Sequence, residues 1–164
     1  PVPAAQVHAM PIGEAMGGGH SPAWAAERYA AELRAAGLTV DGAGFPILDV
    51  VLVGIGSDGH LFSVFPGSAT WDGPAWAQAV PAPTHVGPHV DRVTLHPRVM
   101  DAARLPLAVA HGAAKAAILG RVFGPREDER DLPALLARRS GAVWVLDEAA
   151  AARIPPELRP ASDE

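Results

Sequence analysis

The chain has 164 residues, of which 49% are hydrophobic and 19% are charged, with a formal net charge of -5 and no cysteine. This composition suits a single domain over residues 1–164 and excludes disordered, collagen-like and disulfide-stabilised proteins, while the acidic balance argues against nucleic-acid binding. Because no apolar run is long enough for a membrane span and the first residues lack an export signal, we expect a cytoplasmic protein with no membrane contact.

The first part of the chain predicts an irregular segment, a helix and a strand. Residues 1–22 show no clear periodicity. Ser21 as N-cap, Pro22 at the first helical position and an apolar stripe that ends at Gly37 predict an amphipathic helix. The β-branched run at 48–53 predicts a strand buried on both faces. A glycine-rich turn follows at 54–59, then a short apolar piece at 61–65.

The rest of the chain alternates strands and helices. We expect a long surface loop over 68–88 with a brief helix or extended piece inside it. Strands are predicted at 92–95, 105–110 and 142–146, and helices at 97–103, 112–123 and 132–139. Asp147 predicts the N-cap of a last helix. This alternation indicates an α/β fold with a three-layer, mainly parallel, Rossmann-like sheet and helices on both faces.

The turn after the first predicted strand carries the residues best suited to chemistry, Gly54-Ile55-Gly56-Ser57-Asp58-Gly59-His60. In open α/β sheets, ligands bind at the carboxyl ends of strands. Glycines let backbone N–H groups approach an anion closely, and the Asp58 carboxylate can select the tautomer of His60. From the pattern alone, a functional site and an ordinary turn with a surface histidine remain equal alternatives.

The same turn also fits G-x-G-x-x-G, the dinucleotide-binding pattern. That pattern should open a long helix and be followed by an acidic residue about 20 positions later. Here Pro66 and Gly67 end the next segment within two turns, and no acid lies near Ala79 or Val80. This context argues against a nicotinamide or flavin site.

The turn, together with Phe65-Pro66-Gly67-Ser68, resembles the signature of the 6-phosphogluconolactonases, G-x-G-x-D-G-H followed by S-L-F-P-G. Similar landmarks follow in the family's order at 79–83, 92–95, 112–116 and 144–150, so the resemblance extends from residue 1 to about residue 154. The related glucosamine-6-phosphate deaminases share D-G-H but continue with an A-F-N-E-P type of sequence. Residues 63–67 therefore favour the lactonases. The chain departs from the family pattern at Leu61-Phe62 and at His96.

The resemblance also implies an incomplete domain. Residues 1–8 resemble a passage that the family places in mid-chain, so the amino-terminal third of a family member would be missing. That third ordinarily brings the first strands, a phosphate-binding loop and an arginine that grips the substrate. A fragment without it would expose sheet edges and apolar faces, and we expect it to be poorly stable and inactive alone.

The activity that the resemblance implies is hydrolysis of 6-phospho-D-glucono-1,5-lactone, in the oxidative pentose phosphate pathway, to 6-phosphogluconate. His60 would be the general base and Asp58 would orient it, with no cofactor and no metal. Lys115, the only lysine, resembles the family's phosphate-binding lysine. The remaining candidate substrate-binding residues are Gly54, Gly56, Gly59 and Arg92.

Several alternatives stay open. Arg92 either supports the phosphate or braces the sheet. The protein could be a deaminase or isomerase of the related group, or a non-catalytic fragment that requires its missing part. His85 and His89 have metal-ligand spacing for a helix, but Gly87 and Pro88 predict a loop without a third ligand, so we expect no metal there. The oligomeric state is open, with a homo-oligomer as one alternative.

Overall fold

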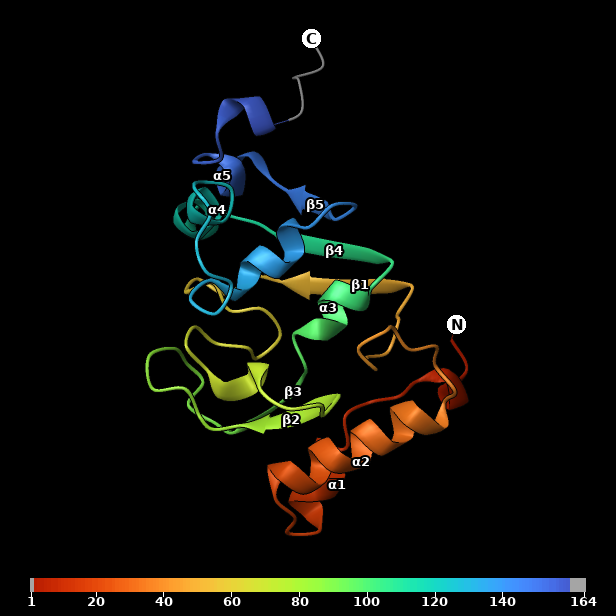
Figure 1. Ribbon diagram of the computed structural model, residues 1–164. Coiled ribbons are helices and arrows are strands. Elements are labelled where there is room, and N and C mark those ends of the chain that lie inside the picture. Colours follow the sequence, from red (N-terminus) through yellow and green to blue (C-terminus); the bar gives the residue numbers. More distant parts are fainter. Residues whose placement is uncertain (1, 160–164) are drawn as a thin grey trace.

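Three parallel strands form the main sheet of the computed structural model, which describes residues 2–159 (Figure 1). They are β1 (Val50–Gly54), β4 (Leu105–Ala110) and β5 (Val143–Leu146), in the order β1-β4-β5. Parallel strands place their carboxyl ends at one edge, so the turn after β1 and the turn after β4 are neighbours. The predicted α/β class with a mainly parallel sheet is confirmed.

Short helices cover one face of this sheet. They are α3 (Arg98–Ala102), α4 (Ala116–Val122), α5 (Glu148–Ala151) and the 3-10 helices η3 (Ala113–Lys115) and η4 (Pro133–Arg138). Alternate strand residues, among them Val51, Val53 and Ala108, pack against the helices in the main core, which also includes the fully buried Leu132. This core supports the turn after β1, because Leu132 packs against Gly59.

The other face of the sheet is exposed. Val50 is 53% exposed, Leu52 is 66% exposed and Val145 is 51% exposed, although all three are apolar. The prediction that the first strand is buried on both faces is therefore wrong for β1, whose residues alternate between exposed and buried. The β-branched run predicts a strand whose composition suits burial on both faces, but nothing within residues 2–159 covers its second face. The apolar surface expected of an incomplete domain is present.

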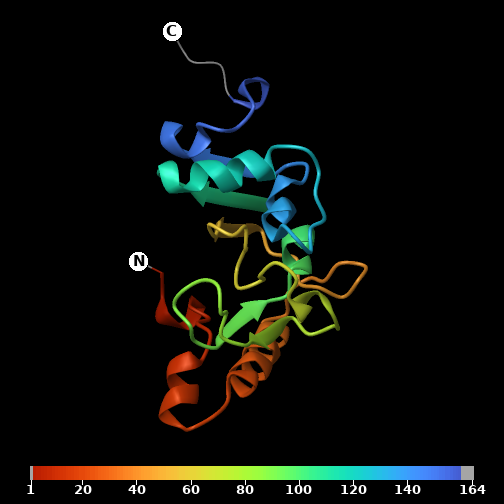
Figure 2. The ribbon, with the colours of Figure 1, turned by 90° about the vertical axis from the view of Figure 1, so that its left-hand side faces the viewer.

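A second layer lies on the far side of β1. Strands β2 (Ala77–Val80) and β3 (Arg92–Leu95) pair antiparallel as a separate sheet, which packs on α2 (Pro22–Ala35); α1 (Ile12–Gly17) lies beside α2 (Figure 2). The predicted strand at 92–95 is confirmed, but it does not join the parallel sheet. Its partner β2 is the extended piece expected in the long loop. Helix α1 was not predicted, because six residues among glycines and prolines show no helical periodicity.

Local signals place the remaining elements well. The Ser21 hydroxyl accepts a hydrogen bond of 3.2 Å from the N–H of Trp24 at the start of α2, and Gly37 follows its end with φ +69°. Three further 3-10 turns lie at η1 (Ala4–Gln6), η2 (Ala69–Trp71) and η5 (Pro156–Leu158). Over residues 2–159, every helix is too short or too polar to span a lipid bilayer. Residue 1 and residues 160–164 of the predicted single domain lie outside the described range.

Candidate active site

Strand β1 ends in a closed glycine turn that carries Asp58 and His60. The N–H of Gly56 donates to the carbonyl of His60 at 2.9 Å, and the N–H of Gly59 donates to the carbonyl of Gly56 at 3.0 Å. Gly59 has φ +89°, and a Cβ there would lie 2.4 Å from Leu132 Cδ1. The turn therefore requires glycine at position 59 for both its backbone conformation and its contact with the core.

The side chains of Asp58 and His60 form a hydrogen-bonded pair. His60 Nδ1 lies 2.6 Å from Asp58 Oδ1, which also accepts the backbone N–H of His60 at 3.1 Å. Because an ionised carboxylate only accepts hydrogen bonds, Nδ1 of His60 carries a proton, and in the neutral imidazole the lone pair is therefore on Nε2. A Cβ on Gly56 would lie 2.1 Å from His60 Nδ1. Glycine at position 56 thus makes room for the pair.

The second oxygen of Asp58 is held by His85, from the loop between β2 and β3. His85 Nε2 lies 2.7 Å from Asp58 Oδ2. Burial alone would raise the pKa of Asp58, but the hydrogen bonds from His85 and His60 outweigh burial and hold this pKa below its usual value. Sequence reasoning missed His85 as a site residue, because 27 positions and an irregular loop separate it from Asp58.

A cavity of about 500 Å³ opens beside this pair and has the size of a small-molecule site. Its lining includes His60, Ser57, Lys115 and, from the loop between β2 and β3, Val86. Lys115 Nζ donates a hydrogen bond of 2.6 Å to the carbonyl of Ile55. The structure therefore brings the predicted base and the predicted phosphate-binding lysine to one cavity at the carboxyl end of β1.

The position of Lys115 depends on the turn after β4. Gly112, with φ +83°, donates its N–H to both carboxylate oxygens of Asp147 at 3.0 Å. Asp147 also accepts the N–H of Ala150, as predicted for the N-cap of the last helix. These hydrogen bonds, led by that of Ala150, lower the pKa of Asp147. One ionised carboxylate thus holds the start of α5 and the turn that leads to Lys115.

The three glycines predicted to bind the substrate differ in their relation to the cavity. Gly54 and Gly56 line the cavity, but the N–H groups of Gly56 and Gly59 already donate within the turn. We therefore expect any oxyanion donor to be another N–H of the turn, with Ser57 as the candidate because it lines the cavity. Substrate binding by the three glycines stays a prediction.

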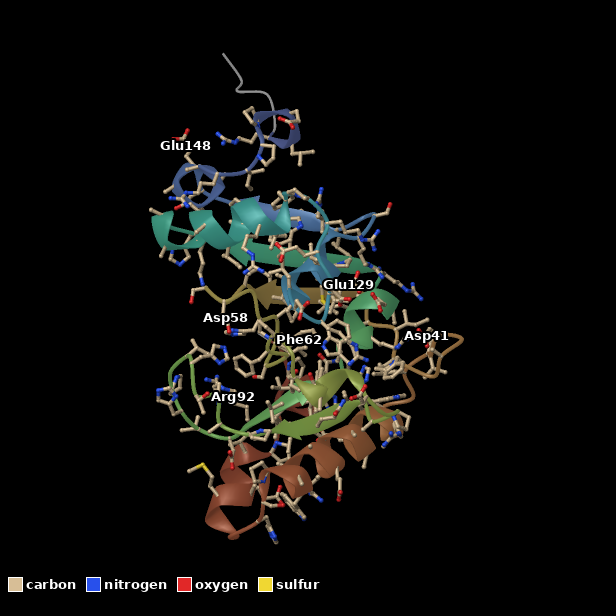
Figure 3. The ribbon with its side chains drawn as sticks, turned by 60° about the vertical axis from the view of Figure 1, so that its left-hand side comes forward. Asp41, Asp58, Phe62, Arg92, Glu129 and Glu148 are labelled. Atoms are coloured by element: carbon tan, nitrogen blue, oxygen red, sulfur yellow. The ribbon has the colours of Figure 1, made fainter. Side chains whose placement is uncertain are left out.

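Arg92 has the contacts of a bracing residue. Its guanidinium lies 5.6 Å from the centre of the Phe65 ring and donates to the carbonyl of Pro88 at 2.8 Å. Figure 3 shows Asp58 on the β1 side of the gap between the two sheets and Arg92 on the β3 side, with Phe62 in the same region. Arg92 is not among the residues that line the cavity. Its role as a substrate ligand stays a prediction.

The two other histidines singled out from the sequence lie elsewhere. His89 Nδ1 lies 2.7 Å from the carbonyl oxygen of Pro83 within its own loop. His96 is 1% exposed and packs against Phe45, with 4.5 Å between ring centres. Burial, followed by the charge of Arg98, lowers the pKa of His96. The departure from the family pattern at His96 therefore affects the core and not the cavity lining.

Residues 1–145 match the protein family described as glucosamine-6-phosphate isomerases/6-phosphogluconolactonase. The chain belongs to this family. A 6-phosphogluconolactonase of Bos taurus is 41% identical over an alignment of 133 positions, which covers 77% of this chain and 48% of the bovine protein. A 6-phosphogluconolactonase of Synechocystis is 30% identical over an alignment of 165 positions, which covers 94% of this chain and 61% of the relative.

The fold agrees with that of a solved family member. The structure of the 6-phosphogluconolactonase of Trypanosoma brucei matches 82% of this chain and 54% of its own length, with a TM-score of 0.70 and 29% sequence identity. The chain therefore spans about half to three-fifths of the length of these members of the isomerase/lactonase family.

Proposed function

We propose that this chain carries the general base of a 6-phosphogluconolactonase, which hydrolyses 6-phospho-D-glucono-1,5-lactone to 6-phosphogluconate in the oxidative pentose phosphate pathway. The observation that carries the proposal is the 2.6 Å hydrogen bond between His60 Nδ1 and Asp58 Oδ1, beside a cavity that Lys115 also lines. The names of the bovine, Synechocystis and Trypanosoma relatives support the same reaction.

The proposed chemistry uses one water and one imidazole. Nε2 of His60 takes a proton from a water molecule while the water oxygen attacks the lactone carbonyl carbon. The tetrahedral intermediate then collapses, the bond between that carbon and the ring oxygen breaks, and His60 returns the proton to the ring oxygen. Asp58 keeps the proton on Nδ1 and stabilises the transient imidazolium. A lactone carbonyl is already electrophilic, so the reaction asks only for this base and a hydrogen-bond donor to the oxyanion.

Lys115 is the proposed ligand of the substrate phosphate. An ammonium group has three N–H donors, and the hydrogen bond to Ile55 uses one of them. The other two can face an anion in the cavity. This assignment agrees with the shared cavity of Lys115 and His60, because a phosphate and a lactone carbonyl belong to opposite ends of one small molecule.

The 164 residues by themselves should turn over slowly. The apolar face of the sheet is exposed beside the cavity, and Leu52, which is 66% exposed, belongs to both. We propose that the amino-terminal third of a lactonase covers this face and adds a second group of phosphate ligands. The oligomeric state and a cytoplasmic location stay predictions.

The test compares two substrates and two proteins. The proteins are the 164-residue chain and a joined chain, in which the amino-terminal segment of the bovine relative precedes residue 1. Freshly made lactone is offered with acid release as the readout, and glucosamine 6-phosphate with ammonia release. We expect acid release by the joined chain and little by the 164 residues. Ammonia release would instead support a deaminase, and full lactonase turnover by the 164 residues would contradict the need for a further segment.

A further inference from the structure

His85 contacts the site in a way that the sequence pattern does not predict. Its Nε2 lies 2.7 Å from Asp58 Oδ2, while the other oxygen of the same carboxylate receives His60. Asp58 is therefore held between two imidazoles, one from the turn after β1 and one from the loop between β2 and β3. His85 is 49% exposed and Asp58 only 18%, so the carboxylate is the shielded centre of this arrangement.

The aromatic ring of Phe65 supports both histidines. Phe65 is 5% exposed, and its ring centre lies 4.7 Å from that of His60 and 5.7 Å from that of His85. The His85 contact is edge-on, at 89° between the ring planes. Contact with this buried ring restricts the rotation of both imidazoles and so helps to keep their nitrogens directed at Asp58.

We propose that His85 is a positioning residue for the catalytic pair, which holds Asp58 Oδ2 so that Oδ1 stays aligned with Nδ1–H of His60. A carboxylate held at one oxygen can rotate about its Cβ–Cγ bond, whereas one held at both oxygens by groups on different elements cannot. Because ionised Asp58 only accepts hydrogen bonds, both histidines must donate to it. His85 touches neither the substrate nor the water in this account, and the proposal rests on the function proposed above.

The loop that carries His85 also reaches the cavity. The next residue, Val86, lines it, so the contact between His85 and Asp58 fixes one wall as well as the carboxylate. The charged groups around the pair are Arg92, whose guanidinium lies over Phe65, and Lys115 in the cavity wall. Neither cation is hydrogen-bonded to Asp58 among residues 2–159, so its second oxygen depends on His85.

The first experiment follows the Asp58 carboxyl group by carbon NMR as a function of pH in the joined chain. Three variants are compared with the parent: His85→Ala, which removes the donor; His85→Gln, which keeps an N–H donor of similar reach; and His89→Ala. His89 is the matched control, because it lies in the same loop and contacts Pro83 instead of Asp58. Since His85 is half exposed, its removal leaves the core intact.

We expect His85→Ala to raise the pKa of Asp58 by about 0.5 to 1 unit, because the ionised form loses one hydrogen bond. His85→Gln should restore most of the difference, and His89→Ala should leave the titration unchanged. An Asp58 titration that is the same in the parent and in His85→Ala overturns the proposal. This result does not depend on lactonase activity, so it separates failure of the positioning role from failure of the proposed function.

The second measurement is the kcat of the joined chain. His85→Ala should lower kcat about three- to tenfold with KM little changed, because the lost alignment affects proton transfer and not substrate binding. His85→Gln should recover most of this loss. An altered Asp58 titration without any change in kcat would mean that the contact exists but does not serve catalysis, and it would overturn the positioning role.

Discussion

The ammonium group of Lys115 donates a 2.6 Å hydrogen bond to the backbone carbonyl of Ile55, and so joins the start of α4 to the end of β1. This contact places the single lysine of the chain where the glycine turn begins. A cation held there has its remaining N–H donors available to a phosphate in the cavity.

Replacement of Lys115 by methionine should therefore weaken substrate binding more than catalysis. We expect Lys115→Met to raise the KM of the joined chain for the lactone about tenfold or more, since hydrogen bonds to charged groups are the strong ones. Its kcat should change by a smaller factor. Lys115→Arg, which keeps the charge, is the control. An unchanged KM in Lys115→Met would show that the lysine only ties Ile55 in place.

Gly56 should be intolerant of a side chain because the hydrogen-bonded pair of Asp58 and His60 lies beside it. A Cβ at Gly56 would lie 2.1 Å from His60 Nδ1, whereas a Cβ at Gly42, which lies outside the cavity lining, would meet no atom within 4 Å. Gly56→Ala should displace the imidazole and lower lactone hydrolysis by about 100-fold, because displacements of this kind disturb proton transfer. Gly42→Ala should stay near the parent rate. Equal rates for the two variants would contradict the geometry of the turn.

The need for glycine at position 59 has two separable parts. Gly59 and Gly67 both have positive φ, but only at Gly59 would a Cβ meet the core, 2.4 Å from Leu132 Cδ1. We expect Gly67→Ala to lower the free energy of unfolding by about 1–2 kcal/mol through backbone strain. Gly59→Ala should lower the free energy of unfolding by a further ~1–3 kcal/mol, because the added methyl group overpacks the core. Urea unfolding of both variants measures the difference. Equal losses of unfolding free energy would contradict a contact between the new methyl group at position 59 and Leu132.

The exposed face of the sheet predicts opposite outcomes for two neighbouring valines. Val50 is 53% exposed and Val51 is 5% exposed on the same strand. In the 164-residue chain, Val50→Asn should change the free energy of unfolding by no more than about 0.5 kcal/mol and should reduce self-association, which light scattering measures. Val51→Asn should cost about 2 kcal/mol or more. Strong destabilisation by Val50→Asn would mean that this face is already covered.

Much of the local structure could be predicted from the sequence because local signals determine it. The Ser21 cap, the turn at Gly37 and the alternation of strands and helices all depend on near neighbours, and the structure agrees with them. The glycine turn after a β-branched run was also enough to place Asp58 and His60 at the end of a strand. These are the parts of the site that lie within a few residues of one another.

The parts that could not be predicted depend on contacts between distant segments. Nothing near His85 in the sequence indicates that its loop folds back onto Asp58. Pairing of β3 with β2 instead of the parallel sheet is likewise a tertiary choice, which β propensity does not report. The exposure of Val50 was missed for a related reason, since a strand's composition shows what it is suited to but not whether a covering layer is present.

The central claim is that His60, oriented by Asp58, is the group that takes the proton from water. Its most direct test is the rate of lactone hydrolysis by the joined chain with His60→Ala. The control is His89→Ala, a histidine that is hydrogen-bonded to Pro83 in its own loop. We predict that His60→Ala lowers kcat by about 100-fold or more while the circular dichroism spectrum stays unchanged, and that His89→Ala stays near the parent. A His60→Ala protein that is folded and hydrolyses the lactone at nearly the parent rate would contradict the account.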